Sequence, residues 1–242
     1  MSTIPTTHPG FEYLGQELEL FQQATHWKAY FASHLKPHLV GDVLEVGAGI
    51  GGTARVLCDG RQKSWSMLEP DAGLAGQLAE SIREQPLPAR QELRVGTTLD
   101  LDSQRYDCVL YMDVIEHIEF DHEELQRAAN LLNPGGALVI LVPAHQWLYT
   151  PFDRAIGHFR RYSRRSLQAV IPDSLVRQKL IYLDSVGLLA SLANRVWLKS
   201  AAPTQRQIQF WDRVLVPCSR WIDPILFHAA GKSVLGVWRK PE

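Results

Sequence analysis

The sequence has few cysteines, no long apolar run and no excess of charge of one sign. Its three cysteines, Cys58, Cys108 and Cys218, stand far apart without a CxxC pair, and such an odd set fits neither a disulfide framework nor a zinc cluster. No stretch approaches the ~20 apolar residues that cross a bilayer, and the first residues lack the basic and apolar regions of a secretory signal. We therefore expect a cytoplasmic protein without stable membrane insertion, whose cysteines are buried as small apolar residues.

The charges of the chain nearly cancel. Lysine and arginine number 25 and aspartate and glutamate 26, for a net charge of -1, so the chain as a whole does not attract nucleic acid or acidic membranes. Hydrophobic residues make up 45% of the 242 residues, which allows one large domain with a substantial core. The composition argues against a nucleic-acid partner and against extensive disorder.

Strands and helices alternate along most of the chain. The apolar stretches "GDVLEV", "KSWSMLEP", "YDCVLYM" and "ALVILVP", the last after a turn "NPGG", lack clear two-residue alternation, which is typical of parallel strands covered on both faces. Apolar residues at helical spacing predict a helix over residues 15–36. We expect "RQKLIYLDS" to form another strand and residues 187–230 to form helices that Pro217 and Pro224 kink or break. We expect "SVLGVWRK" to form a closing strand. The fold class is therefore α/β: a Rossmann-like, mostly parallel sheet with helices on both faces and a helical insert before the last strand.

A glycine-rich turn follows the first of these strands. Gly47, Gly49 and Gly51 let the backbone turn sharply and approach a ligand, and the helix that follows offers free N–H groups at its start. Gly47, Gly49 and Gly52 also satisfy GxGxxG, so the spacing alone does not separate a dinucleotide site, another nucleoside-cofactor site and a tight structural turn.

Two acidic residues narrow the choice of cofactor. Glu69 ends the second strand about 20 residues beyond the glycines, where a carboxylate can accept both ribose hydroxyls of either NAD or S-adenosylmethionine. Glu45 stands two residues before Gly47, where a dinucleotide fold usually has an apolar residue. A carboxylate at that place suits a cofactor with a positively charged amino acid portion, which favours S-adenosyl-L-methionine.

Four motifs between residues 40 and 143 resemble, in order and spacing, those of class I S-adenosylmethionine-dependent methyltransferases: "VLEVGAGIGG", "MLEPD", "YDCVLYMDVIEHI" and "LLNPGGALVILVP". The resemblance implies a seven-stranded sheet with one reversed strand near the edge, which the late "SVLGVWRK" segment fits. It also implies the cofactor-binding residues: Glu45 at the methionine ammonium, Gly47, Ala48, Gly49 and Gly51 under the methionine portion, Glu69 and Pro70 at the ribose, Thr97 and Thr98 at the adenine, and Met112 and Asp113 beside the acceptor pocket.

Methyl transfer to oxygen requires a base beside the methyl group. A sulfonium methyl is already electrophilic, so the protein must mainly position the nucleophile and exclude water. An oxygen nucleophile must also lose its proton, and histidine is the usual base near neutral pH. His117, His145 and His158 lie near the expected pocket, and we expect a small-molecule acceptor that is methylated at oxygen.

The segment "DVIEHI" suggests a metal site as one alternative. Asp113, Glu116 and His117 resemble the pattern with which some quinone-type O-methyltransferases bind magnesium or a similar divalent ion. Such an ion would orient a hydroxyl and lower its pKa. The preferred interpretation is that Glu116 and His117 fix the loop after the strand.

The segment "VPAHQWLYTPFDRAIGHFRRYSRRSL" follows the fifth strand, whose carboxyl end opens onto the pocket in such sheets. It resembles a segment of a bacterial subset of these methyltransferases that carries a GHxRRY run. One hypothesis makes His158 the base and gives the acceptor four binding residues: Tyr149, Arg160, Arg161 and Tyr162. The other pairs the arginines with Asp153 or other carboxylates, which would hold the loop closed. Ser163 is predicted to cap the following helix.

These expectations give one methyltransferase domain over residues 1–242. Its predicted parts are an N-terminal helical segment (1–38), a cofactor-binding core (39–145), an acceptor-side loop, helix and strand (146–184), a helical insert or cap (185–231) and a closing strand (232–242). Trp197, Trp211 and Trp221 of the insert are interpreted as core or homodimer contacts, while a pocket lining or a membrane surface, and with it an amphiphilic acceptor, stays an open alternative. The rival functions are an NAD(P)-dependent oxidoreductase and an inactive S-adenosylmethionine-binding partner subunit.

Overall fold

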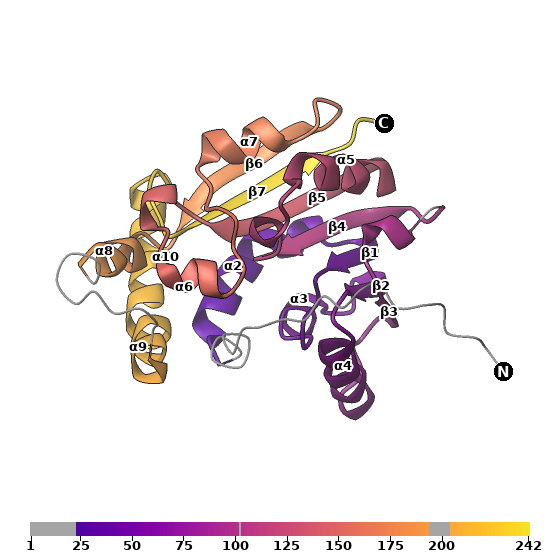
Figure 1. Ribbon diagram of the computed structural model, residues 1–242, viewed down its shortest axis with the longest axis horizontal. Helices are drawn as coiled ribbons and strands as arrows, with labels where there is room; N and C mark the ends of the chain where they lie inside the picture. Colours follow the sequence, from indigo (N-terminus) through magenta and orange to yellow (C-terminus); the bar gives the residue numbers. More distant parts are fainter. Residues whose placement is uncertain (1–22, 102, 194–203) are drawn as a thin grey trace.

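A seven-stranded sheet forms the centre of the computed structural model, which describes residues 23–101, 103–193 and 204–242 (Figure 1). The strand order is β3-β2-β1-β4-β5-β7-β6, and β7 runs antiparallel to both of its neighbours while the other pairs are parallel. This confirms the predicted fold class and the reversed strand. The strands are β1 Gly41–Val46, β2 Gln62–Glu69, β3 Arg90–Val95, β4 Tyr106–Met112, β5 Leu132–Pro143, β6 Val176–Leu183 and β7 Ser233–Arg239.

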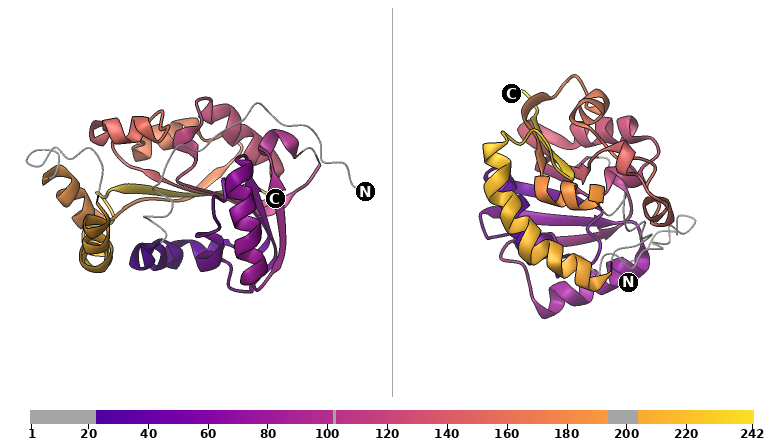
Figure 2. Two further views of the ribbon diagram at one scale, coloured as in Figure 1. Left: turned by 60° about the horizontal axis from the view of Figure 1, so that its bottom comes forward. Right: turned by 90° about the vertical axis from the view of Figure 1, so that its left-hand side faces the viewer.

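Helices cover both faces of the sheet (Figure 2). One face packs against α2 (Thr25–Leu35), α3 (Ala54–Leu57) and α4 (Ala72–Glu84), and the other against α5 (Asp121–Leu131) and α7 (Arg164–Val170). Successive residues of β4 explain why the sequence lacks alternation: Cys108 and Leu110 join the core on the first face, and Val109 and Tyr111 join the core on the second. A central parallel strand needs apolar residues on both sides.

Two predicted boundaries differ from the structure. Within the described residues the N-terminal helix begins at Thr25, and the predicted portion 15–22 lies outside them. The segment "NPGG" is part of β5 rather than a turn before it: the register of β5 against β4 shifts between the pairs Tyr106–Leu132 and Cys108–Ala137. Gly135 takes a φ of 74° in this irregularity, a conformation that glycine adopts without strain.

The insert consists of α8 (Ser185–Ala193) and a helical rod that crosses one end of the sheet (Figure 2, right). The rod runs from α9 (Gln205–Phe210) through a π-turn (Trp211–Leu215) into α10 (Val216–Ile225). Of the predicted breaks, Pro217 lies in the first turn of α10, where its missing N–H is harmless, and Pro224 lies one residue before the end. Among the residues described, no helix combines the length and apolarity needed to span a bilayer.

The rod holds the N-terminal helix in place. α2 has no side-chain cap of its own, and Asp212 of the π-turn supplies one: its carboxylate accepts from the Trp27 N–H at 2.8 Å and the His26 N–H at 3.3 Å. Trp197 lies outside the described residues, Trp211 packs against Trp27, and Trp221 is exposed. Cys58 and Cys108 are buried as expected, whereas Cys218 on the rod is exposed.

Candidate active site

A cavity of about 1460 Å³ opens at the carboxyl ends of the central parallel strands. Its walls include the last residue of β1 and the residues that follow β2, β4 and β5. The strand order reverses between β1 and β4, and open α/β sheets bind their ligands at such a switch point. The cavity exceeds the roughly 300–1,000 Å³ of a single small-molecule pocket, so it has room for a cofactor and an acceptor together.

The glycine turn forms the floor of one half of this cavity. Gly47, Gly49 and Gly51 have φ values of 67°, 54° and 82°, which side chains other than glycine rarely adopt. A Cβ on Gly47 would also lie 2.6 Å from Cγ2 of Val114. The carboxylate of Glu69 accepts from the Gly49 N–H at 2.7 Å, and it faces the cavity from the end of β2. The turn therefore depends on its glycines, and Glu69 holds it in shape.

Glu45 is not brought to the cavity. It lies buried beneath the glycine turn, where its carboxylate accepts from Trp65 Nε1 at 2.8 Å, and burial raises its pKa to about 8. Lys28 of α2 lines the cavity instead, and its Nζ lies 2.9 Å from the position that a Cβ on Gly52 would take. Sequence reasoning missed Lys28, because no motif links a helix residue to a turn more than twenty positions later.

Thr97 and Thr98 line the far end of the same half. Thr97 caps the short 3-10 turn Thr98–Asp100 together with Asp100. The Thr98 hydroxyl donates to Glu124 at 2.8 Å and is buried. Both hydroxyls are thus engaged within the protein, so this part of the wall offers backbone groups and the exposed side chain of Leu99.

An aspartate–histidine pair marks the other half of the cavity. Asp153 lies on α6 (Pro151–Ala155) and is fully buried, and its Oδ1 is 3.0 Å from Nδ1 of His158. Gly157, with a φ of 87°, turns the chain so that these two residues meet. Arg161 donates to both carboxylate oxygens, at 2.7 and 3.0 Å. Burial alone would raise the pKa of Asp153, but the hydrogen bonds from His158 and Arg161 lower it, so Asp153 is ionised and accepts the Nδ1 proton.

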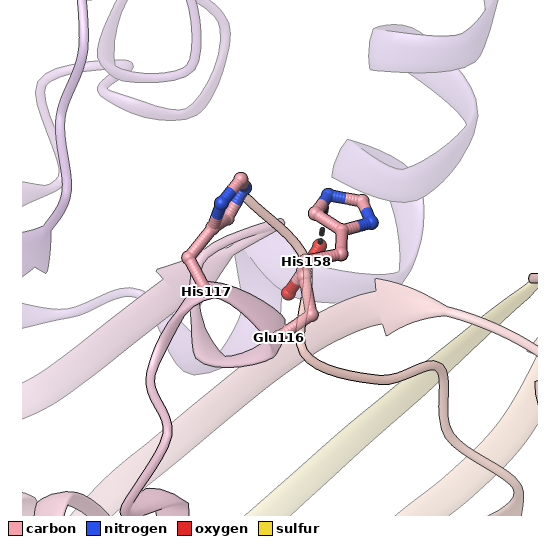
Figure 3. A group of neighbouring side chains, drawn as sticks. All are labelled: Glu116, His117 and His158. Atoms are coloured by element: carbon pink, nitrogen blue, oxygen red, sulfur yellow. Dashed lines mark ion pairs between the residues drawn. The ribbon is translucent and has the colours of Figure 1, made fainter. Parts of the chain in front are cut away.

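Glu116 and His117 lie beside His158, on the 3-10 turn Ile115–His117 that follows β4 (Figure 3). Glu116 is fully buried, and within the described chain neither of its oxygens has a hydrogen-bond partner. Burial raises the pKa of Glu116 well above its usual value, and its Oε1 lies 3.9 Å from Nε2 of His158. Burial lowers the pKa of His117 to about 4, and its ring meets that of His158 edge to face with centroids 4.5 Å apart.

The same three side chains can supply metal ligands. Donor atoms of Glu116, His117 and His158 lie within 4.8 Å of one another, and a set of two imidazoles and one carboxylate suits zinc or a similar transition metal better than magnesium. The predicted set was Asp113, Glu116 and His117; in the structure His158 takes the place of Asp113 in the group of neighbouring donor atoms.

Three predicted acceptor-side residues lie away from the cavity. His145 has its Nε2 3.0 Å from the Gly231 carbonyl and stacks on Tyr182. The Arg160 guanidinium lies 2.6 Å from the carboxylate of Asp121, and the buried Tyr162 hydroxyl donates to that carboxylate at 2.6 Å. Arg160 and Tyr162 thus share Asp121 as their partner, whereas Arg161 pairs with Asp153.

The other residues of this segment line the cavity or shape its loop. Arg161 and Tyr149 both line the cavity, and the Tyr149 hydroxyl donates to the His158 carbonyl at 2.6 Å. Ser163 caps α7 as predicted, accepting from the Ser166 N–H. Carboxylates hold both arginines: Arg161 pairs with Asp153, and Arg160 pairs with Asp121. This agrees with the hypothesis that ion pairs hold the loop closed. Lys232, at the start of β7, also lines the cavity and had no signal in the sequence.

Comparisons with known proteins agree with this geometry. The chain matches the family model described as "Methyltransferase domain" over residues 17–173. The fold is similar to that of N-methyltransferase NodS from Bradyrhizobium japonicum in complex with S-adenosyl-L-homocysteine, with a TM-score of 0.58, 13% identity and coverage of 92% of this chain and 88% of that one. It is also similar to that of phosphoethanolamine N-methyltransferase 2 from Haemonchus contortus in complex with S-adenosyl-L-methionine. The TM-score is 0.63, the identity is 15%, and the match covers 94% of this chain and 58% of that one.

A shorter sequence match connects the chain with a much larger protein. The hybrid PKS-NRPS synthetase traA from Penicillium crustosum is 28% identical over 112 residues, which are 44% of this chain and only 3% of the synthetase. The family match, in contrast, covers more than half of the chain. S-Adenosylmethionine, not NAD(P), is therefore the cofactor, and the chain belongs to the methyltransferase domain family, as a class I S-adenosylmethionine-dependent methyltransferase.

Proposed function

We propose that the protein transfers the methyl group of S-adenosylmethionine to a hydroxyl group of a small-molecule acceptor, with His158 as the general base. The observation that carries the proposal is the Asp153–His158 pair, 3.0 Å apart, at the wall of the cavity beyond the cofactor half. The carboxylate holds the proton on Nδ1 and leaves Nε2 able to accept another.

The residues of the chain then have separate roles in the reaction. S-Adenosylmethionine, when bound, supplies an electrophilic methyl on a sulfonium sulfur. Nε2 of His158 takes the hydroxyl proton of the acceptor as its oxygen bonds to the methyl carbon, and the electron pair of the broken S–C bond stays on sulfur. Asp153 stabilises the imidazolium that forms, and Arg161 keeps Asp153 ionised. The cavity walls position the two reactants and exclude water.

For the cofactor we propose the assignments of the resemblance with one change. Lys28, which lines the cavity above the glycine turn, binds the methionine carboxylate. Burial lowers the pKa of Lys28, and Asp212 opposes this shift more strongly than Glu45 does. The remaining contacts stay as expected: Gly47, Ala48, Gly49 and Gly51 at the methionine portion, Glu69 and Pro70 at the ribose, Thr97 and Thr98 at the adenine, and Met112 and Asp113 beside the acceptor pocket.

The base can be tested with a matched pair of histidine variants. H158A removes the Nε2 base, and H145A removes a histidine whose ring lies outside the cavity. Formation of S-adenosylhomocysteine is measured with alcohols and amines of equal carbon skeleton, and cofactor binding by calorimetry. We expect H158A to lose about 10²–10⁴ in turnover with unchanged S-adenosylhomocysteine affinity, and H145A to stay active.

Other outcomes select among the alternatives. Turnover with amines alone replaces oxygen by nitrogen as the methylated atom, and normal turnover of H158A removes it as the base. Cofactor binding without turnover across the panel identifies an inactive partner subunit. A metal bound to Nε2 of His158 would exclude that nitrogen as a base, so the metal and general-base proposals are mutually exclusive.

A further inference from the structure

Lys232 is placed on the acceptor side of the cavity, opposite the ribose-binding carboxylate. It directly precedes β7, which pairs with β5, whereas Glu69 ends β2 on the other side of the switch between β1 and β4. Both residues line the same cavity. A cofactor that lies over β1 and β2 would therefore leave Lys232 to face the acceptor.

The ammonium group of Lys232 is held without forming an ion pair. Its Nζ lies 5.0 Å from the ring centroid of Trp211, a cation–π contact. Trp211 is fixed in turn, because its Nε1 donates to Asp184 at 2.7 Å. Within the described ranges no carboxylate lies within 4.0 Å of Nζ, in contrast to Arg161, which forms a bidentate pair with Asp153.

The carboxylate that attracts Lys232 most strongly, Asp184, already has other hydrogen-bond partners. Asp184 accepts from Trp211, from the Ser219 hydroxyl at 2.7 Å and from the Gly187 N–H at 3.0 Å. Burial lowers the pKa of Lys232, which Asp184 and Asp113 partly oppose. A buried cation without a partner is unfavourable, and a ligand anion in the cavity would remove this cost.

We propose that Lys232 and Trp211 form a subsite for an anionic group, a carboxylate or a phosphate, of the methyl acceptor. The inference rests on the proposed function, because it assigns this half of the cavity to the acceptor. Apolar side chains make up much of the neighbouring wall, among them Leu148, Ile156 and Leu215. The acceptor is thus an anionic molecule with an apolar body.

Simple alkyl probes test this subsite without knowledge of the acceptor. Protein saturated with S-adenosylhomocysteine is titrated with decanoate, decyl phosphate and 1-decanol, and binding is followed by tryptophan fluorescence, to which Trp211 contributes as one of seven tryptophans. The same titrations are run on K232M and K232R. S-Adenosylhomocysteine affinity is measured separately for each variant.

We expect both anions to bind the wild-type protein at least tenfold more tightly than 1-decanol. K232M should remove this preference and leave 1-decanol and S-adenosylhomocysteine unaffected, while K232R keeps it. A stronger preference for one anion identifies the acceptor group as carboxylate or phosphate. Equal binding of the three probes, or a uniform loss in K232M, would overturn the proposal; failure of H158A to affect turnover would instead overturn the base assignment alone.

A separate observation concerns the outer surface of the helical rod and α8. Large apolar side chains are exposed there, with Trp221 at 79% and Phe227 at 88%. The others are Leu189, Leu192, Phe210, Val214, Ile222, Ile225 and Leu226. The set is named here the apolar rod surface, and it meets the cavity at Phe210, which lines it.

The exposed charged side chains of the rod are all arginines. Arg206, Arg213 and Arg220 are all exposed. The two carboxylates of the rod, Asp212 and Asp223, are buried and bonded to residues of α2. A symmetric dimer through this surface would therefore bring arginines together without exposed carboxylates of the rod to neutralise them.

We infer that the apolar rod surface lies against the surface of an anionic lipid bilayer. Aromatic and aliphatic side chains flanked by arginines are the composition of an interfacial helix. The contact is peripheral and differs from membrane insertion. It would bring the mouth of the cavity to the interface from which an anionic amphiphile is taken up.

Vesicle sedimentation tests this surface. The full chain is mixed with phosphatidylcholine vesicles with and without 30% phosphatidylglycerol, and R206Q/R213Q/R220Q is compared with R83Q/R90Q/R105Q, which removes three arginines exposed elsewhere. Only the first variant should lose binding to anionic vesicles, by about a hundredfold, since each arginine near such a surface contributes roughly a factor of five. No binding by the wild type, equal loss in both variants, or a dimer in light scattering that W221S abolishes would overturn the inference.

Discussion

Replacement of Asp153 by asparagine tests the centre of the acceptor half. The side chains of Asp153 and Arg161 are 1% and 14% exposed, and two hydrogen bonds join them. Asparagine has nearly the same shape but no charge, so D153N leaves a buried guanidinium without its counter-ion. Breaking one partner of such a pair costs about 3–5 kcal/mol. At roughly 2–4 °C per kcal/mol for a chain of this length, the thermal midpoint should fall by about 6–20 °C.

The effect of D153N depends on pH in a defined direction. Burial opposes ionisation of Asp153, but the hydrogen bonds from His158 and Arg161 lower its pKa below the ordinary value of about 3.9. A group whose pKa is lower in the folded state stabilises the fold fully above its unfolded pKa, and this stabilisation is lost as the pH falls through the folded value. The difference between wild type and D153N should be constant near neutrality and shrink below about pH 4.

Urea denaturation followed by circular dichroism measures the free energy of unfolding of D153N, R161M and D153N/R161M. The double variant leaves no charge unpaired, so it should lose less stability than the sum of the single variants. A loss below about 1 kcal/mol for D153N, or strict additivity, would show that the pair does not hold the loop.

Two further predictions concern the cofactor turn and the metal alternative. G47A should weaken S-adenosylhomocysteine binding at least about tenfold in calorimetry, because Gly47 has a φ of 67° and its Cβ would meet Val114; G76A, with open space around it, is the control. Exhaustive chelation should leave turnover unchanged, and a loss that zinc restores would favour a metal on His158.

The glycine turn and Glu69 could be predicted because the residues that form this half of the cavity lie close together in the sequence. The positive φ angles of the glycine turn are written in neighbouring residues, and Glu69 follows at a fixed distance along one strand–helix–strand unit. Glu45 was assigned to the ligand although it lies beneath the turn. The sequence gives no signal for Lys28, which we propose as a cofactor-binding residue, because its approach to the cavity depends on how α2 packs.

The arrangement of the acceptor half of the cavity depends on side-chain contacts that the spacing of residues in the sequence does not predict. His158 was expected at the pocket and lines it, since Gly157 folds the chain back onto Asp153. Arg160 and Tyr162 were grouped with Arg161, but they contact Asp121 at the start of α5, whereas Arg161 contacts Asp153. Lys232 comes from a strand about seventy residues later, so only the closed sheet brings it near.

Because the carboxylate of Asp212 caps α2, the insert and the N-terminal helix are structurally coupled. The rod is therefore not a removable lid: cutting the chain back to residues 39–145 would delete Lys28, and deleting the rod alone would release the helix start that positions it. Binding energies at the two halves are then linked, because whatever steadies the rod also steadies the lysine beside the glycine turn. A minimal, separable cofactor-binding fragment of this chain should bind S-adenosylmethionine more weakly than the whole.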